Sequence, residues 1–459
     1  MLAFLLPLLC AAPLQGGDPE SKPPGPAAAH TAFQAKSAGG LRYVWWLPEG
    51  YDGKRARNLT VILHGTGLDY RWGYWNNPPG TFRPQDVVVS VDGTSPGQGD
   101  SRLFLGEPKD ADAFHAFLEE MRKLFAVDRI YLYGHSQGGF FVTYYSGLHP
   151  DAVAGVVAHA SGVWTWTETG KKASRVAVAL LHGAADPVVP YRQSPGSYEA
   201  LREAGFERLL LRRMPGYNHW PNAVRATECL DWCEGMTTED PDRALALAVE
   251  LLRPKGPDQY QYEIPPAFAA ARMVLGRLQG EGPDPLAGTP STLQERAAEL
   301  RSALDRFGAE IAKELEKDVG KKLALAAEPP LAGLLAFRED FRGVEPAERW
   351  LQKLGFDKAA KAHAKAAAAA LDAWYAEQKA DGDRFVEIVA ALADGWLFDG
   401  YPPELGEKLA DWHASAKSLG LDKKALKAYD EVVEPWRKGW EARAWERYAQ
   451  ACAGWKPPK

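Results

Sequence analysis

Residues 134–139 read Gly134-His135-Ser136-Gln137-Gly138-Gly139 and stand between two apolar runs of different type. The run before them, 129–133, has the β-branched and aromatic bias of a buried strand. The run after them, 140–145, continues as an apolar helix up to Gly147. Strand, sharp turn and helix form the context in which a Gly-x-Ser-x-Gly sequence raises its serine hydroxyl above a sheet. Glycine is needed two residues before and after the serine because a Cβ there would clash within the tight turn.

The rest of the segment from residue 40 to residue 255 supplies further apolar runs. The expected strands span residues 41–48, 58–63, 86–91, 129–133, 154–159, 175–183 and 208–214. The expected helices span residues 110–125, 140–147, 197–204 and 241–252. Continuous apolar strands separated by helices are typical of a mostly parallel sheet with helices on both faces. In such sheets, functional residues gather at the carboxyl ends of the strands.

Composition excludes several classes of protein. The chain has 459 residues, 46% hydrophobic and 25% charged, which is enough for two or three domains. A net charge of −6 gives no basic surface for phosphates, so nucleic acid is not expected as a partner. No stretch is long and apolar enough to span a bilayer, so the sequence does not predict an integral membrane protein.

The N-terminus has the pattern of an export signal. Residues 1–12 form an apolar segment of signal-peptide length, and small residues follow it. We expect a signal peptide over residues 1–17 and an exported protein, periplasmic or extracellular. Residues 18–39 are rich in Pro, Gly and Ala and predict a flexible lead-in.

The composition changes after a Pro-rich seam at residues 254–266, which is the expected domain boundary. We therefore expect a catalytic domain over residues 40–255 and an α-helical domain over residues 256–459. Two similar pairs of segments suggest two repeated helical units within it. These pairs are 341–343 with 354–358, and 398–400 with 419–423.

Cysteines and histidines give no pattern of a metal site. Cys229 and Cys233 lie four residues apart, where a bridge and two free buried thiols are both open readings. Cys10 falls in the leader, and Cys452 lies near the end of the chain. No second pair of ligands stands at a spacing that suits zinc, and no metal or cofactor is implied.

A serine nucleophile needs a base to take its proton and an acid to orient that base. On sheets of this type they follow the serine in the order acid, histidine. Asp186 lies just past the expected strand 175–183, and His219 follows the expected strand 208–214. The plain alternatives are a turn-forming aspartate for Asp186 and a loop histidine without a role for His219.

Other histidines are weaker candidates for the base. Three of them stand beside glycines at strand ends and are expected to shape turns, namely His64, His135 and His182. His115 lies in an expected helix, and His363 and His413 belong to the helical half.

Backbone N–H groups are expected to hold the oxyanion of the reaction. One belongs to Gln137, the residue after the nucleophile, and another to the glycine-rich loop 64–67, most simply to Thr66. An ordinary glycine-rich turn is the alternative for the loop. The order of Ser136, Asp186 and His219 favours the catalytic interpretation.

These segments together resemble a known group. The segments 43–51, 63–67, 127–139, 182–191 and 219–221 recur in this order in it. The chain is similar over residues 40–255 to secreted esterases of the α/β-hydrolase fold related to polyhydroxybutyrate depolymerases and feruloyl or acetylxylan esterases. The resemblance implies Ser136 as nucleophile, Asp186 as acid and His219 as base, with Thr66 and Gln137 as oxyanion donors.

Tryptophans near the expected site are candidates for substrate binding. Four of them lie in two loops expected at the carboxyl end of the sheet, and the fifth follows His219; they are Trp72, Trp75, Trp164, Trp166 and Trp220. Aromatic walls suit an aryl or sugar ester. Core packing is an equally strong interpretation, since tryptophan is buried in most places.

The sequence thus predicts a serine esterase that forms an acyl-enzyme on a feruloyl, acetyl or hydroxyalkanoate-type ester, including esters linked to polysaccharide or polyester. The rivals are a peptidase on the same fold and a non-catalytic binding protein. The helical half is expected to have an accessory role and to bind a protein partner or a surface.

Overall fold

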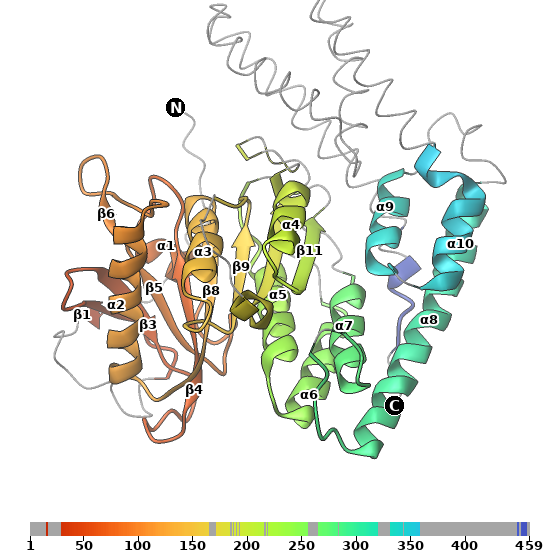
Figure 1. Cartoon of the computed structure of the whole chain (residues 1–459), viewed down its shortest axis with the longest axis horizontal. Helices are drawn as coiled ribbons and strands as arrows, with labels where there is room; N and C mark the ends of the chain where they lie inside the picture. The colour runs from red at the N-terminus through yellow and green to blue at the C-terminus, as the bar shows by residue number, and fades with distance from the viewer. Residues whose placement is uncertain are drawn as a thin grey trace, which may run out of the picture. The chain divides into compact units, whose positions relative to one another are not determined.

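The apolar runs of the sequence form one central sheet in the computed structural model of the chain (Figure 1). The structure describes residues 15–16, 29–164, 171–183, 186, 188–189, 191, 193–214, 217, 219–255, 265–282, 284–319, 331–342, 344–358, 448 and 451–456.

The structure has a strand at each of the seven expected runs and describes four short strands besides. They are β1 (Gln15–Gly16), β2 (Phe33–Lys36), β3 (Arg42–Trp46), β4 (Arg57–Leu63), β5 (Val87–Val91), β6 (Ser95–Pro96), β7 (Arg102–Leu103), β8 (Val127–His135), β9 (Gly155–His159), β10 (Ala177–Gly183) and β11 (Arg208–Met214). Nine of them form the main sheet in the order β1-β2-β3-β5-β4-β8-β9-β10-β11, and β6 pairs with β7. Strand β3 is antiparallel to β2 and β5, whereas β4 is parallel to β5 and β8, and β8 to β9. The prediction of a mostly parallel sheet is confirmed.

The structure describes ten α-helices. They are α1 (Arg71–Asn76), α2 (Pro108–Leu124), α3 (Gln137–Leu148), α4 (Gln193–Glu203), α5 (Ala223–Thr237), α6 (Pro241–Leu251), α7 (Phe268–Leu278), α8 (Ser291–Val319), α9 (Leu331–Asp340) and α10 (Glu345–Leu354), with a 3₁₀ turn at Lys171–Arg175. The long helix α2 begins with Pro108 at its first turn and buries an apolar stripe, as the period of its sequence predicts.

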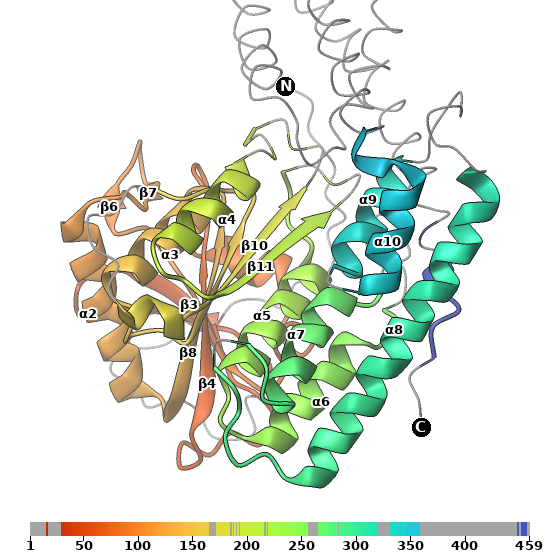
Figure 2. The ribbon, with the colours of Figure 1, turned by 45° about the vertical axis from the view of Figure 1, so that its right-hand side comes forward.

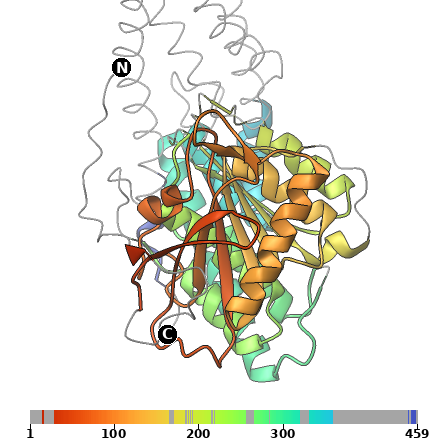
Figure 3. The ribbon, with the colours of Figure 1, turned by 90° about the vertical axis from the view of Figure 1, so that its left-hand side faces the viewer.

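Helices lie on both faces of the sheet at strand β3. Side chains three residues apart on a strand point to opposite faces. Tyr43 on β3 packs edge-on against Phe117 of α2, and Trp46 on the same strand packs edge-on against Tyr74 of α1. Helices α1 and α2 therefore lie on opposite faces, as Figure 3 shows in a view along the sheet.

The carboxyl ends of the central strands are level. Leu63 at the end of β4 pairs with Val91 at the end of β5 and with Gly134 near the end of β8. His135 pairs with His159, the last residue of β9. The loops that follow β4, β5 and β8 therefore start from the same edge of the sheet, which is the edge where the candidate residues are expected.

By its internal contacts the chain divides into two compact units. Unit 1 comprises Met1–Leu180, Ser197–Leu210 and Ala223–Cys233, and unit 2 comprises Leu181–Gly196, Leu211–Asn222 and Glu234–Lys459. This division follows contacts within the folded chain and does not test where one domain ends. The domain boundary expected near residue 255 stays a prediction.

Unit 2 contains helices α6 to α10, which Figure 2 shows with their labels. An aromatic cluster forms its core, in which Phe268 of α7 contacts Phe307 of α8. Trp455 closes the cluster: its ring packs against Phe268 and Phe307, and its indole N–H donates to the carbonyl of Leu252 over 3.0 Å. The prediction of a helical C-terminal region is confirmed.

Some elements differ from the expectations. Phe33–Lys36, within the expected lead-in, forms β2 because it pairs with β3 and stacks Phe33 on Trp45. Helices α1 and α5 were not expected. Of the part that carries the expected signal peptide, only Gln15–Gly16 are described, and the second repeat copy at 398–400 and 419–423 lies outside the described residues. Among the helices that the structure describes, none is both long and apolar enough to cross a membrane.

Candidate active site

Ser136 stands in a strained turn between β8 and α3. Its backbone has φ 53° and ψ −117°, a conformation that residues with a side chain rarely adopt. Its N–H donates to the carbonyl of His159 over 2.9 Å, and its own carbonyl accepts from the N–H of Phe140 over 3.0 Å. The turn is therefore fixed on both sides, and the half-buried serine is placed before the first residue of the helix.

The glycines of the turn are required by close backbone contacts. A Cβ on Gly134 would lie 2.2 Å from the carbonyl oxygen of Gly138. A Cβ on Gly138 would lie 2.5 Å from the carbonyl oxygen of Leu63. Both distances are far below van der Waals contact, so the spacing of the motif is imposed by the packing of α3 against the ends of β8 and β4.

The strain at Ser136 leads to a stability prediction. Glycine adopts positive φ without a Cβ penalty, whereas alanine does not. We expect Ser136→Gly to unfold with a free energy about 1 kcal/mol higher than Ser136→Ala, the remainder of a strain of roughly 1–3 kcal/mol after the entropy cost of glycine. Urea denaturation of the two variants measures the difference, and equal midpoints would show that the turn is not strained.

Buried aromatic rings support the turn from below. Trp72 of α1 stacks on His135 with ring centroids 4.9 Å apart, and His135 stacks on His159 at 5.0 Å. The Nδ1 atoms of the two histidines are 2.9 Å apart, so one ring donates and the other accepts. With only 4% of its surface exposed, Trp72 packs as a structural residue beneath Ser136.

The two expected oxyanion donors both lie in unit 1 with the serine. A Cβ on Gly65 would lie 3.0 Å from the Cβ of Ser136, so the loop that carries the exposed Thr66 passes directly beside the serine. Gln137 is the first residue of α3, where N–H groups have no partner within the helix. Its side-chain oxygen accepts from the N–H of Phe104 over 3.3 Å, which anchors it. Helix N-termini of this kind favour negative charge.

Asp186 and His219 meet in unit 2. Oδ2 of Asp186 accepts from Nδ1 of His219 over 2.7 Å. Oδ1 of Asp186 accepts from the backbone N–H groups of Val188 and Val189 over 2.8 and 2.9 Å. The side chain of Asp186 is fully buried, whereas that of His219 is 12% exposed, so the carboxylate is fixed and the imidazole reaches the surface.

A second histidine holds the same carboxylate, and the sequence analysis assigned it only to turn formation. Nε2 of His182 lies 2.8 Å from the carbonyl oxygen of Val189 and 3.2 Å from Oδ2 of Asp186, so this nitrogen carries the proton. Its Nδ1 accepts from the hydroxyl of Ser194 over 2.6 Å. His182 is completely buried with both nitrogens engaged, which leaves His219 as the candidate base.

These donors keep Asp186 ionised. Burial alone would raise the pKa of its carboxyl group, but the hydrogen bonds and charges of His182 and His219 outweigh it and hold the pKa well below its usual range. The pKa is lower in the folded than in the unfolded protein. The ionised group therefore stabilises the fold above the unfolded-state value of about 3.9, and this stabilisation is lost as the pH falls through the folded-state value.

A pH-dependent stability follows for Asp186→Asn. We expect its free energy of unfolding to be on the order of 2 kcal/mol lower than that of the wild type at pH 7. The gap is expected to persist at pH 5 and to shrink only below about pH 4, where the carboxyl groups begin to bind protons. Urea denaturation at pH 7, 5 and 3.5 measures the gap. A gap that already closes at pH 5 would show that Asp186 has an ordinary pKa.

The remaining aromatic candidates have different surroundings. Trp75 and Trp220 are 55% and 50% exposed, and Arg71 lies over the ring of Trp75 at 5.4 Å. Trp164 is half-buried and stacks on Phe140 of α3 at 5.6 Å. Trp166 lies outside the described residues. Among the described tryptophan candidates, Trp75 and Trp220 thus have the most exposed side chains.

The cysteine question is answered by the structure. Cys229 and Cys233 on α5 are buried thiols that are not joined in a disulfide, and the same is true of Cys452. Burial raises the pKa of the Cys233 thiol well above its usual value, which makes it unreactive. Within the described part of the chain, no cluster of three or more His, Cys, Asp or Glu side chains could hold a metal ion.

Comparison with known proteins adds family evidence. Residues 108–226 match the phospholipase/carboxylesterase family, and this range contains Ser136, Asp186 and His219. No curated protein matches the chain.

Among solved structures, the chain is similar to a carboxylesterase from Mesorhizobium loti, with 21% identity, a TM-score of 0.35, and coverage of 41% of this chain and 94% of that one. It is also similar to a CE1 ferulic acid esterase from Anaeromyces mucronatus, with 18% identity, a TM-score of 0.34, and coverage of 43% and 86%. A carboxylesterase from Bacillus cereus gives 18% identity, a TM-score of 0.35, and coverage of 43% and 94%. The sheet order and the turn at Ser136 are those of the α/β-hydrolase fold, and within it residues 108–226 are similar to the phospholipase/carboxylesterase family.

Proposed function

We propose that the protein hydrolyses carboxylic esters, with Ser136 as nucleophile, His219 as base and Asp186 as the acid that orients the base. The observation that carries the proposal is the strained backbone of Ser136 at the end of a parallel strand, since strain of this kind persists where function needs it. The family match over residues 108–226 supports ester hydrolysis.

The hydrogen bonds of His219 suit the role of base. Its Nδ1 donates to Asp186, so the lone pair of the neutral ring is on Nε2. In the proposed reaction, Nε2 takes the proton of the Ser136 hydroxyl as the oxygen attacks the ester carbonyl. The ionised Asp186 stabilises the imidazolium that forms, and the hydrogen bonds from His182 and His219 hold its pKa low enough to keep it ionised at neutral pH despite its burial.

The remaining steps of the proposed cycle stabilise the oxyanion, release the alcohol and hydrolyse the acyl-enzyme. The N–H groups of Thr66 and Gln137 donate to the oxyanion of the tetrahedral intermediate. The imidazolium of His219 returns its proton to the alcohol, which leaves the acyl group bonded to Ser136. Water then attacks the acyl-enzyme, His219 takes one of its protons, and the carboxylic acid departs as Ser136 regains its hydrogen.

The substrate class is proposed from the exposed aromatic rings and the sequence resemblance. Trp75 and Trp220 are about half exposed, and exposed aromatic side chains suit contact with an aryl group or a sugar ring. Feruloyl esters of polysaccharides have an aryl group and a sugar ring. Acetyl esters of polysaccharides have a sugar ring and a short acyl chain, and hydroxyalkanoate esters have short acyl chains. We propose these as the substrate candidates, with export from the cytoplasm as the route by which the enzyme reaches them.

The test is a panel of substrates. It contains short-chain nitrophenyl esters, methyl ferulate, acetylated xylan, hydroxybutyrate oligomers and one chromogenic peptide, each incubated with the wild type and with Ser136→Ala. Hydrolysis of an ester by the wild type alone is the expected result. Cleavage of the peptide without any ester would favour a peptidase, and no hydrolysis by a folded protein would favour a binding role.

The helical region is proposed as an accessory module. Tyr448 and Trp455 return to it from beyond residue 358: the hydroxyl of Tyr448 donates to Asp340 over 2.6 Å, and Trp455 joins the core of unit 2. A deletion confined to residues 359–447 therefore keeps Tyr448 and Trp455, which pack in this core. Unchanged activity, localisation and binding in that variant would contradict an accessory role for the deleted segment.

A further inference from the structure

His64 immediately precedes the oxyanion loop, and its ring is completely buried. Its Nδ1 lies 2.8 Å from the carbonyl oxygen of Gly65, and its Nε2 lies 3.2 Å from the backbone N–H of Gly93. A carbonyl only accepts and an N–H only donates, so the hydrogen-bond network assigns the proton to Nδ1 and the lone pair to Nε2. Both nitrogens are therefore engaged in fixing backbone.

The bond to Gly65 determines the direction of the neighbouring N–H. The peptide between Gly65 and Thr66 is planar and trans, so its C=O and its N–H point in opposite directions. Because the C=O turns inward to the buried ring of His64, the N–H of Thr66 turns outward, at the exposed side of the loop that passes Ser136. The carbonyl also accepts from the N–H of Leu68 over 3.2 Å, which closes the turn.

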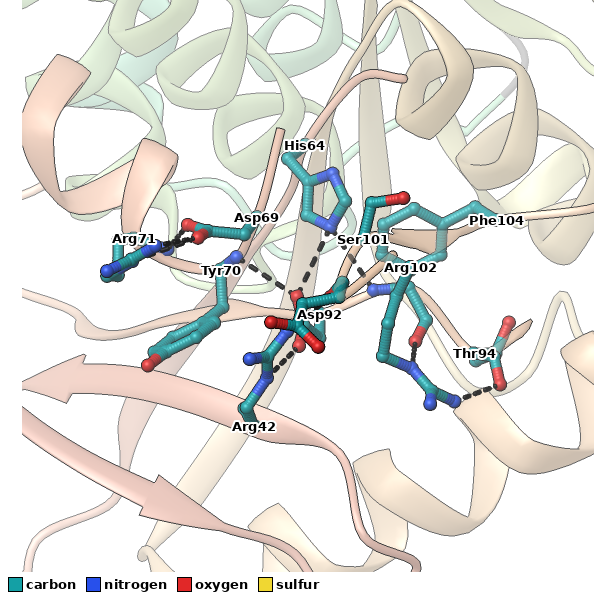
Figure 4. A network of polar contacts seen from close by, with 12 residues as sticks. Arg42, His64, Asp69, Tyr70, Arg71, Asp92, Thr94, Ser101, Arg102 and Phe104 are labelled. Atoms are coloured by element: carbon teal, nitrogen blue, oxygen red, sulfur yellow. Dashed lines mark hydrogen bonds and ion pairs between the residues drawn. The ribbon is translucent and has the colours of Figure 1, made fainter. Parts of the chain in front are cut away.

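A buried carboxylate holds the other end of the loop. Asp92 follows β5, and its Oδ1 accepts from the N–H of Tyr70 over 3.3 Å and lies 3.7 Å from Nε2 of His64 (Figure 4). Its Oδ2 accepts from Nε of Arg42 over 2.5 Å, which balances the charge of the buried group. The loop from residue 64 to residue 70 is thus held at both ends by residues that follow β5.

We infer that His64, held through Gly93 and Asp92, is a positioning residue of the oxyanion hole, because its Nδ1–H fixes the peptide that presents the N–H of Thr66. The inference rests on the proposed function, since it assigns a role at the same site. His64 touches no reacting atom in this scheme. It acts through the peptide plane, so its effect belongs to the transition state and not to substrate binding.

Two substitutions at His64 test the hydrogen bonds of its two ring nitrogens separately. The amide of asparagine ends where the ring has Nδ1, so His64→Asn keeps a donor for Gly65. The amide of glutamine reaches one atom farther, so His64→Gln keeps a partner for the N–H of Gly93 and loses the donor for Gly65. His115→Phe on α2 is the control for loss of a histidine elsewhere, where the ring contacts Tyr145 and His149 at the far end of α3.

The readout is kcat and KM for the best ester, together with inhibition by a trifluoromethyl ketone. In that inhibitor, the Ser136 oxygen adds to the ketone carbon, its proton passes to His219, and the carbonyl oxygen becomes the oxyanion. We expect His64→Gln to lower kcat and inhibitor affinity by about 10- to 100-fold, less than the loss of a whole oxyanion donor, with KM within about threefold. His64→Asn and His115→Phe are expected to stay within about threefold of the wild type.

Several results would overturn the inference. Equal loss in His64→Gln and His64→Asn, no loss in either, or a change in KM alone would each contradict it. If circular dichroism shows His64→Gln to be unfolded, Asp92→Asn takes its place, since Asn keeps an acceptor for Tyr70 and loses the charge facing Arg42. A wild-type kcat in that variant would contradict the inference, and a lower kcat with unchanged KM would support it. A wild type that hydrolyses no ester overturns the proposed function itself, which separates the two failures.

Discussion

Replacing Ser136 with alanine is expected to lower kcat for ester hydrolysis by roughly 10⁵- to 10⁶-fold. The substitution removes the atom that is proposed to form the acyl-enzyme, while the backbone demand of the turn stays the same for both residues. The residual rate is expected to come from the oxyanion hole and from binding alone. Initial rates on the best nitrophenyl ester, at enzyme concentrations high enough to detect the residual rate, measure the effect.

A matched control is present in the same helix. Ser146 of α3 is buried, and its hydroxyl donates to the carbonyl of Thr143 over 2.9 Å. Ser146→Ala is expected to keep kcat within about twofold of the wild type, because a single neutral hydrogen bond contributes only about 1 kcal/mol to stability. If Ser136→Ala retains more than a hundredth of the wild-type kcat, another group is the nucleophile.

Replacing Asp186 with asparagine is expected to lower kcat by about 10⁴-fold with little change in KM. The amide cannot stabilise an imidazolium, and its NH₂ group favours the tautomer of His219 with the proton on the wrong nitrogen. The carboxylate accepts four hydrogen bonds, from His219, His182, Val188 and Val189. Asparagine has the same shape, but its NH₂ group would face donors at a position where a carboxylate oxygen accepts.

Asp240 gives the corresponding control. It caps α6, and its side chain accepts from the N–H groups of Asp242 and Arg243. Asparagine is an equally good N-cap, so Asp240→Asn is expected to keep both kcat and stability close to the wild type. An Asp186→Asn protein with kcat within tenfold of the wild type would remove Asp186 from the proposed mechanism.

The sequence predicted best what depends on local sterics. The turn at Ser136 needs glycine two residues before and after it, and both contacts come from backbone that every such turn shares. Asp186 and His219 were predicted from their places after two strands, and the structure brings the two side chains into hydrogen-bond contact. Their relation to Ser136 stays part of the proposal.

Roles that depend on distant contacts were not predictable. His64 and His182 stand beside glycines in the sequence, and their partners Gly93 and Ser194 are identified only once the chain is folded. Trp72 has the same sequence surroundings as Trp75, yet Trp72 is 4% exposed and Trp75 is 55% exposed. One-dimensional spacing does not distinguish these environments.

Helix α5 was missed for a different reason. It is buried on several sides, and a helix of that kind shows no amphipathic stripe. Its charged residues are buried in pairs instead of marking a solvent face, as Arg225 with Glu228 and Asp231 with Arg83 show. The sequence therefore shows no amphipathic helical period over residues 223–237.

The most direct test of the central claim is to map the site of reaction with a nitrophenyl phosphonate. The oxygen of Ser136 is expected to attack phosphorus and release one nitrophenolate per protein, while its proton passes to His219. Mass spectrometry of the digested protein should then find a single phosphonate adduct, on Ser136, formed together with complete loss of ester hydrolysis. An adduct on another residue, or a protein that still hydrolyses esters without an adduct, would contradict the assignment of Ser136 as the nucleophile.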